Sequence, residues 1–207
     1  MENFDIDKLI INKFIKKMKT TSYARYDAHK RCERLNNSSL FALTSASLLL
    51  IFLGILNLYS SPQCPFTTKG YIDIFSIFTS VLVLVLSLIV SFASYSLKSE
   101  RYFRSGNDMS EMCERLEITD TKDVDTIRRI INKYNQLKKH SDNHQSHNYK
   151  KGRLERKVEN NDTLDENDTL GFSDYVSYWA PIAAFYLLSL LSIFTFTYVI
   201  WNFIKYA

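Results

Sequence analysis

The sequence predicts an all-α membrane protein with two to three transmembrane helices and a cytoplasmic helical bundle. Three long stretches carry this prediction, because residues 35–68, 74–97 and 175–204 contain no Asp, Glu, Lys or Arg. All 26 Lys and Arg residues are crowded into what remains. A soluble globule has no reason to segregate charge in such blocks, so the hydrophobic share of 46% averages two different kinds of sequence.

The N-terminal region, 1–39, predicts a cytoplasmic amphipathic helix. Its apolar residues Ala24, Ala28, Cys32 and Leu35 recur at helical spacing on one side. The first membrane helix then follows at 40–58.

A spanning helix needs about 20 mostly apolar residues, which 40–58 and 74–97 supply. We expect a short external loop at 59–73 to join them. In the segment 175–204, Trp179 and Trp201 lie near the two ends of the apolar run 178–200. Their separation of about 33 Å along a helix suits the two interfacial belts of a bilayer. Because its flanks carry little charge, the third segment either spans the membrane or lies against the bilayer or the bundle.

The segment between the second and third apolar stretches predicts a helical hairpin followed by a linker. No breaker separates Lys98 from the second membrane helix, so one helix should continue unbroken to about residue 118. From Val124, apolar residues at helical spacing predict a second, amphipathic helix to about 140, which completes the hairpin 98–140. Residues 141–174 are polar and acidic, typical of a partly disordered linker.

The distribution of basic residues predicts the orientation. Residues 1–39 hold nine Lys and Arg and 98–174 hold fifteen, whereas 59–70 and the last six residues hold one each. The positive-inside rule therefore places the N-terminus and the central region in the cytoplasm. A juxtamembrane basic set near anionic lipid is favoured over direct nucleic-acid binding: Arg25, Lys30, Arg31, Arg34, Lys98 and Arg101.

A polar stripe follows one side of the second membrane helix. At 100° per residue its members lie within about 60° of one another. Small hydroxyl residues favour packing against another helix, and the alternative is that several copies assemble with the stripe lining a pore. Asp73 would then lie at the outer mouth of the pore, although the simpler interpretation is a carboxylate at the start of a helix. The stripe consists of Ser76, Ser80, Ser87, Ser91 and Ser94.

The sequence carries no enzyme, metal or cofactor signature. It has no glycine-rich phosphate loop and no hydrolase or metalloprotease motif, and its three cysteines lie far apart. His140, His144 and His147 share one helical face, which would suit zinc or a pH sensor, but solvated histidines are favoured because no Cys or Glu completes a site. We therefore expect a non-enzyme without metal or cofactor.

Two groups of residues resemble a known family. The first is Tyr23-Ala24-Arg25-Tyr26-Asp27-Ala28, followed by Lys30-Arg31; the second includes Lys133-Tyr134-Asn135-Gln136-Leu137, Asn143-His144 and Asn148-Tyr149. Together with two membrane helices and a cytoplasmic helical region, they are similar to the SLATT family of bacterial conflict systems over roughly 8–175. The positions that carry the resemblance are Tyr23, Tyr26, Tyr134, His144 and Tyr149.

The resemblance implies a multi-pass effector of antiphage defence in the bacterial inner membrane. Such an effector forms homo-oligomers and opens a pore or disrupts the membrane when a separate sensor protein from the same operon detects infection. In related systems the sensor is a nucleotide-signalling enzyme, and in the branch most similar to this chain it is a reverse transcriptase. The alternative function is a non-conducting anchor or scaffold that recruits a cytoplasmic partner, for example a nucleoprotein.

Overall fold

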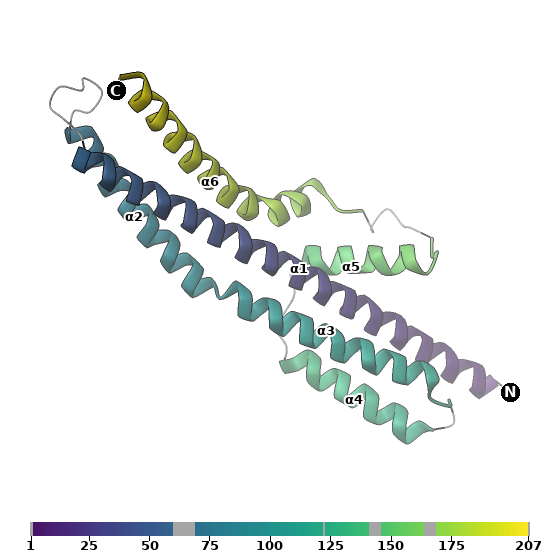
Figure 1. Cartoon of the computed structure of the whole chain (residues 1–207). Coiled ribbons are helices and arrows are strands. Elements are labelled where there is room, and N and C mark those ends of the chain that lie inside the picture. Colours follow the sequence, from purple (N-terminus) through teal and green to yellow (C-terminus); the bar gives the residue numbers. More distant parts are fainter. Residues whose placement is uncertain (1, 60–68, 122, 141–145, 164–168, 207) are drawn as a thin grey trace. The chain divides into compact units, whose positions relative to one another are not determined.

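The computed structural model describes residues 2–59, 69–121, 123–140, 146–163 and 169–206, without the side chains of 2–7, 59, 69–71, 140 and 202–206. Over these residues the chain forms six α-helices and no strand (Figure 1). The helices are α1 (Glu2–Tyr59), α2 (Lys69–Ala93), α3 (Tyr95–Ile118), α4 (Val124–His140), α5 (Ser146–Glu159) and α6 (Phe172–Tyr206).

Three helical segments are long and apolar enough to cross a membrane: Lys8–Leu58, Ile72–Ile118 and Phe172–Trp201. They contain the predicted membrane helices 40–58 and 74–97 and most of the third segment, 175–204. The all-α membrane fold is therefore confirmed.

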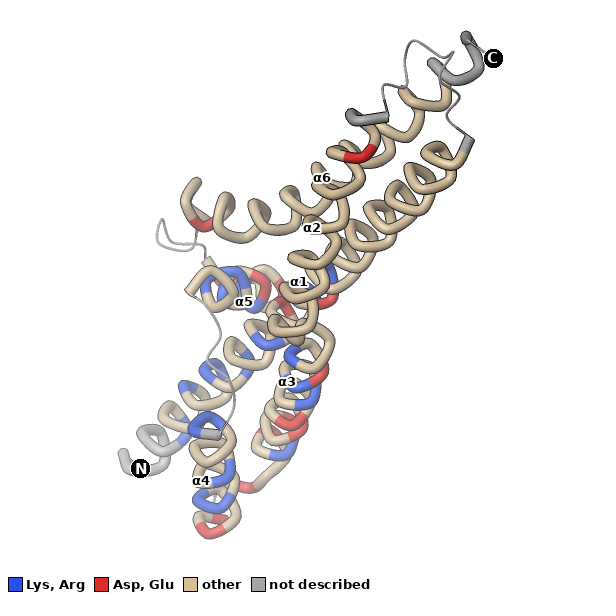
Figure 2. Tube along the Cα trace, turned by 90° about the vertical axis from the view of Figure 1, so that its left-hand side faces the viewer, with Lys and Arg blue, Asp and Glu red and all other residues tan. Residues whose placement is uncertain are grey.

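The chain divides into two compact units. We call Met1–Glu33 with Ser96–Tyr178 the bundle unit, and Arg34–Tyr95 with Trp179–Ala207 the membrane unit. Helices α1 and α6 contribute residues to both. Lys, Arg, Asp and Glu are concentrated on α3, α4, α5 and the first half of α1, as Figure 2 shows.

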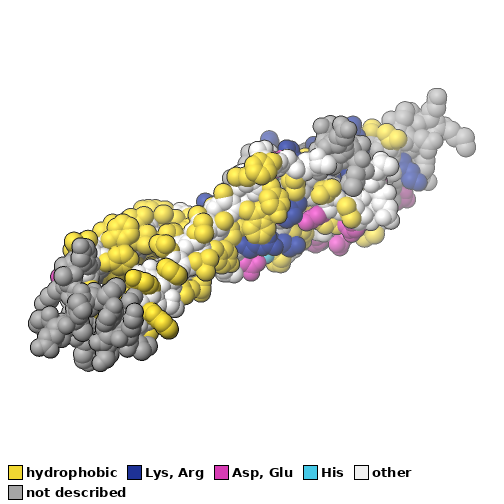
Figure 3. Space-filling model, turned by 90° about the horizontal axis from the view of Figure 1, so that it is seen from above, with side chains coloured by type: hydrophobic (Ala, Val, Ile, Leu, Met, Phe, Trp, Pro, Cys, Tyr) yellow, Lys and Arg dark blue, Asp and Glu magenta, His cyan; other side chains and the backbone are white. Residues whose placement is uncertain are grey.

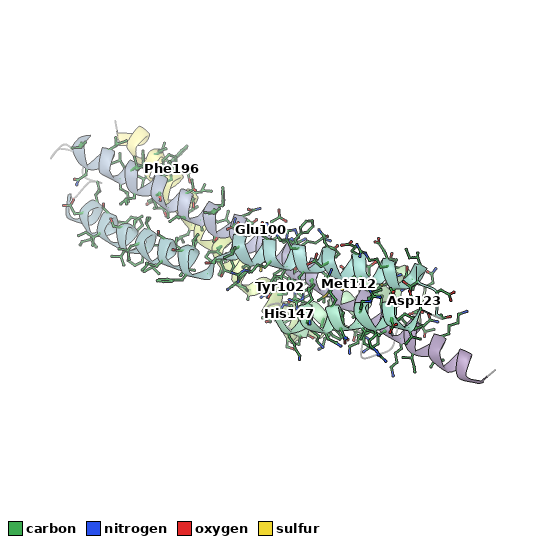
Figure 4. The ribbon with its side chains drawn as sticks, turned by 90° about the horizontal axis from the view of Figure 1, so that it is seen from below. Glu100, Tyr102, Met112, Asp123, His147 and Phe196 are labelled. Carbon is green, nitrogen blue, oxygen red and sulfur yellow. The ribbon has the colours of Figure 1, made fainter. Side chains whose placement is uncertain are left out.

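The core of the bundle unit joins α1, α3 and α4. Phe14 of α1 packs edge-on against Tyr134 of α4, with ring centroids 6.1 Å apart. Met112 of α3 lies in the same core (Figure 4). These contacts confirm a bundle formed by the N-terminal helix, the segment after the second membrane helix and the following amphipathic helix; its buried members are Met18, Met109, Met112, Cys113, Leu116, Ile127, Ile130 and Tyr134.

Helix α5 departs from the expected linker. The predicted linker 141–174 is wrong for Ser146–Glu159, which is helical. Residues 141–145 and 164–168 lie outside the described residues. This segment lacks an apolar stripe, so periodicity gives no signal. Its buried residues are mostly polar or charged, which means that tertiary contacts rather than an apolar face stabilise the helix: His147, Asn148, Gly152, Arg156 and Lys157.

The prediction that the second membrane helix continues unbroken to about residue 118 is also wrong, because the helix is interrupted at Ser94. Helix α2 ends at Ala93 and α3 begins at Tyr95, because Ser94 adopts a left-handed backbone conformation with φ of 47°. Neither Gly nor Pro marks the interruption, so composition could not reveal it.

In the membrane unit, α1, α2 and α6 each have a row of buried or half-buried residues spaced alternately three and four positions apart, and we call this row the seam of the helix. Such spacing is the pattern of coiled-coil packing. Phe52 of α1 contacts Phe196 of α6, with ring centroids 4.5 Å apart. Near the ends of α1 and α2, Asn57 donates a 2.8 Å hydrogen bond to Asp73. The seam residues are Leu35, Ser39, Ala42, Ala46, Leu49, Leu53 and Leu56 on α1; Ile72, Ser76, Thr79, Val83, Leu86, Val90 and Ala93 on α2; and Ile182, Phe185, Ser189, Ser192, Phe196 and Val199 on α6.

Large apolar side chains cover the rest of the membrane unit. Phe92 is 81% exposed, Ile74 68% and Phe194 70%. Hydrophobic side chains extend over the visible face of this unit in Figure 3. Soluble monomers rarely expose patches of this extent, so the surface indicates contact with lipid.

Candidate functional site

The motif around Tyr23–Ala28 lies where α1 contacts three other helices of the bundle unit. Ser22 donates a 3.0 Å hydrogen bond to the carbonyl of Gly106 on α3, and the Tyr26 hydroxyl donates to Asn107 at 2.7 Å. Thr21 and Tyr134 of α4 share a hydrogen bond of 3.1 Å. The motif therefore fixes the positions of α3 and α4 on α1.

Arg25 is buried, so the expectation that it faces lipid headgroups is wrong. Its side chain is 1% exposed, and its guanidinium lies 5.5 Å from the ring centroid of Tyr102 on α3 (Figure 4). Here a planar cation packs against an aromatic face inside the bundle.

The other residues of the predicted basic set lie nearer the surface. Lys30, Arg34, Lys98 and Arg101 are exposed and Arg31 is half-buried. Arg34 lies 5.5 Å from the ring centroid of Trp179. These five positions remain compatible with a juxtamembrane role.

Helix α5 is joined to α1 through the buried carboxylate of Asp27, which is 1% exposed. Asn148 donates a 2.9 Å hydrogen bond to one oxygen of Asp27, and Lys151 forms an ion pair with the other. A Cβ at residue 152 would lie 2.8 Å from the Ala24 Cα, so the two helices touch through their backbones. We call Ala24, Asp27, Asn148, Lys151 and Gly152 the clasp.

The clasp keeps its cation charged. Burial lowers the pKa of Lys151, but the hydrogen bond and the negative charge of Asp27 more than compensate, so the net pKa is raised. A buried carboxylate with an ion partner and an amide donor is satisfied, whereas the same carboxylate without them would be strongly unfavourable. The clasp therefore needs all of its polar members.

The first turns of α6 join the same region of the bundle unit. Lys150 forms a 2.7 Å ion pair with Asp174, and Arg31 donates a 3.0 Å hydrogen bond to the carbonyl of Ser177. The ring of His147 packs edge-on against Tyr178 with centroids 5.7 Å apart. Helix α5 thus contacts both α1 and the start of the third apolar helix.

His147 is buried, so the expectation of solvated histidines is wrong at this position (Figure 4). Burial is the main cause that lowers its pKa; Arg31 and Lys151 lower it further, while Asp27 and Asp174 raise it. His144 and the side chain of His140 lie outside the described residues. Over the part of the chain that is described, no group of three His, Cys, Asp or Glu residues could hold a metal.

The serine stripe of α2 lies beside the seam. Ser76 belongs to both and is half-buried, whereas the other four serines are exposed. At 100° per residue the centre of the stripe lies about 80° from the centre of the seam. Ser80 bonds the carbonyl of Ser76 at 2.9 Å and Ser94 that of Ser91 at 3.2 Å, so these hydroxyls are satisfied within the helix. Asp73 accepts the hydrogen bond from Asn57.

The family positions fall into different environments. Tyr134 is fully buried, Tyr23 donates to Glu159 of α5, Tyr26 bonds α3, and Tyr149 is 40% exposed. Lys151 and Gly152, which contact Asp27 and Ala24 of the same motif, were not predicted from the sequence. A glycine inside the helical register of 146–159, in a chain with only five glycines, was the available signal.

Comparison with known families gives one result. The model of the SMODS and SLOG-associating 2TM effector domain family 5 matches residues 7–204. The match extends beyond the expected 8–175 and includes the third apolar helix within the region typical of the family. Searches of curated proteins and of solved structures find no significant match.

Proposed function

The chain belongs to the family of SMODS and SLOG-associating 2TM effector domains, and from this membership we propose that it is a triggered membrane-breaching effector of antiphage defence. Several copies assemble in the inner membrane and open a pore or disrupt the bilayer. The N-terminus and the bundle unit lie in the cytoplasm, where a separate sensor from the same operon acts on them. A reverse transcriptase or a nucleotide-signalling enzyme would fill that role.

The exposed serine stripe is the observation that carries the proposal. Within the chain, α2 packs through its seam, which leaves Ser80, Ser87 and Ser91 on a neighbouring face. In the membrane, small hydroxyl residues allow close approach of another helix and bond across the contact. A second copy packed there would place hydroxyl groups along an assembly of α2 helices, with Asp73 near its outer end.

The clasp supports regulation through the bundle unit. A protein that binds the bundle unit and displaces α5 would break contacts to α1 and to the start of α6 together. Helices α1 and α6 each contribute residues to both units, so we expect displacement of α5 to alter their apolar segments as well. This expectation supports regulation by a cytoplasmic signal.

The test is membrane depolarisation in bacterial cells that express the chain with its genomic neighbours, measured before and after phage infection. Depolarisation that requires both infection and the chain supports the proposal. An unchanged membrane potential, with the chain inserted and its partners present, would instead support a non-conducting anchor or scaffold.

A further inference from the structure

Helix α4 carries a dense positive charge. It holds five Lys and Arg residues and one Asp, a net charge of +4, which equals the formal net charge of the whole protein. Helix α1 has the same net charge of +4, but spread over 58 residues, whereas α4 concentrates it in 17.

The cations of α4 lie on its solvent side. Ile127, Ile130 and Tyr134 are buried in the core of the bundle unit. The five Lys and Arg residues are exposed, and no ion pair joins any of them to another residue of the described chain: Arg128, Arg129, Lys133, Lys138 and Lys139. Figure 2 shows these basic residues along α4.

A groove between α3 and α4 adjoins this basic face. It has a volume of about 370 Å³, within the range of about 300–1,000 Å³ that is typical of ligand sites. Met112, Ile118 and Ile130 give the groove an apolar part. Ile118 is 86% exposed, so this part of the groove is open to an apolar side chain.

Cations flank the apolar part of the groove. Arg129 and Lys133 of α4, one turn apart, line it together with Arg115 of α3. Arg115 is paired with Glu111 at 2.6 Å, so Arg129 and Lys133 are the cations best placed for a new partner. The groove thus combines an apolar anchor site with positive charge.

From this combination we propose that the α3–α4 groove and the basic face of α4 bind an acidic protein segment that carries apolar anchor residues. This inference rests on the proposed function and deepens it, because the segment would belong to the separate protein that triggers the effector. Acidic side chains pair with Arg129 and Lys133, while an apolar side chain contacts Met112, Ile118 and Ile130. Charge complementarity of this kind speeds encounter and excludes basic proteins.

Two other polyanions fit the surface less well. Single-stranded nucleic acid is bound through exposed aromatic rings, but the aromatic residue of α4, Tyr134, is completely buried. A phosphate backbone also has no apolar group for the groove. A helix that lies in a lipid surface needs a free apolar face, and the apolar face of α4 is already packed in the core.

The experiment measures binding to the full chain in phosphatidylcholine nanodiscs by fluorescence anisotropy. The probe is a labelled synthetic peptide of about 14 residues, or four helical turns, in which leucines at helical spacing interrupt a run of glutamates. A second peptide replaces the leucines by serines. A short single-stranded RNA and phosphatidylglycerol vesicles are titrated in parallel.

We expect the Glu/Leu peptide to bind and the Glu/Ser peptide to bind about fivefold or more weakly, because the apolar contact is lost. Arg129→Glu with Lys133→Glu should weaken the Glu/Leu peptide at least about tenfold. The matched control, Lys8→Glu with Lys13→Glu, makes the same charge change at exposed residues of α1 and should alter binding less than about twofold. Arg129→Ala with Lys133→Ala serves as a second variant if the charge reversal lowers the melting temperature.

Three results would overturn the inference. They are absence of peptide binding, equal binding to the α4 variants, and tighter binding of RNA or vesicles that depends on Arg129 and Lys133. Dye release from liposomes by the same proteins separates this inference from the proposed function. Release with no peptide binding rejects the docking surface alone, whereas peptide binding without any release under a trigger rejects the membrane-breaching function.

Discussion

Gly152 of α5 lies against the backbone of Ala24 in α1 so closely that a Cβ at position 152 would come within 2.8 Å of the Ala24 Cα. The neighbouring atoms belong to the backbone of α1, which cannot move aside as a flexible side chain could. The same crossing places Asn148 and Lys151 on the carboxylate of Asp27. Close approach and a buried polar contact thus depend on each other.

Gly152→Ala should therefore destabilise the bundle unit by about 1–3 kcal/mol, the usual cost of forcing extra atoms into a packed contact. The measurement is thermal unfolding in detergent by circular dichroism, together with proteolysis within α5. Gly54→Ala is the matched control, because a Cβ at Gly54 meets nothing within 4 Å. Equal melting temperatures for Gly152→Ala and the unmodified protein would contradict the observed crossing.

The two ionic members of the clasp should respond unequally to mutation. Lys151→Met leaves the buried Asp27 carboxylate without its cation and should cost about 3 kcal/mol. Asp27→Asn should cost only about 1 kcal/mol, because the Lys151 side chain is 30% exposed and can turn to water. Chemical denaturation of the two variants and of the double variant measures both effects and their coupling, and a larger loss for Asp27→Asn would reject this order.

His147 should make the stability of the bundle unit depend on pH. Its pKa is lowered in the folded protein from the ordinary value of 6.5, mainly by burial, so the unfolded chain takes up a proton first as the pH falls. Stability is fully present above about pH 6.5 and decreases as the pH falls from there toward the folded pKa.

The measurement for this prediction is the melting temperature between about pH 7.5 and 5, in the unmodified protein and in His147→Gln. The variant should show a shallower decline, because glutamine does not titrate. Parallel curves for the two proteins would show that His147 does not cause the pH dependence.

The serine stripe can be tested by enlarging its side chains. Ser80→Leu and Ser87→Leu should each abolish cell killing and dye release while membrane insertion persists, because a bulky side chain prevents close approach of another α2 helix. Val81→Leu and Val85→Leu are the controls, since both residues are exposed outside the stripe. Undiminished leakage by both serine variants would reject the stripe as the lining or contact face.

The interruption at Ser94 makes a prediction of its own. A non-glycine residue in the left-handed region costs about 1 kcal/mol or more relative to glycine, so Ser94→Gly should raise stability by about that amount. Ser94→Val should lower it, because a branched side chain at this φ is more strongly disfavoured. Thermal unfolding of the two variants decides the matter, and a stabilising valine would show that the segment prefers a continuous helix.

Much of the fold could be predicted because membrane helices follow from local composition. Of the predicted apolar stripe, Ala24, Ala28 and Leu35 are buried and Cys32 is half-buried, and the apolar side of α4 packs in the core. Helix α5 could not be predicted, because its polar surface becomes stable only against Asp27 and Ala24. Arg25 was misplaced for a similar reason, since its position in sequence resembles a juxtamembrane cation while Tyr102 holds it inside the bundle.

By itself, the sequence determined that three apolar segments need a bilayer and that the charged segments between them need water. This follows because transfer free energies are additive along a chain and need no knowledge of partners. Only the tertiary structure decided which face of α2 is used within the chain and which is left for other contacts. It also decided that α5 is a helix, because helix–helix contacts depend on residues more than a hundred positions apart, such as Asp27 and Lys151.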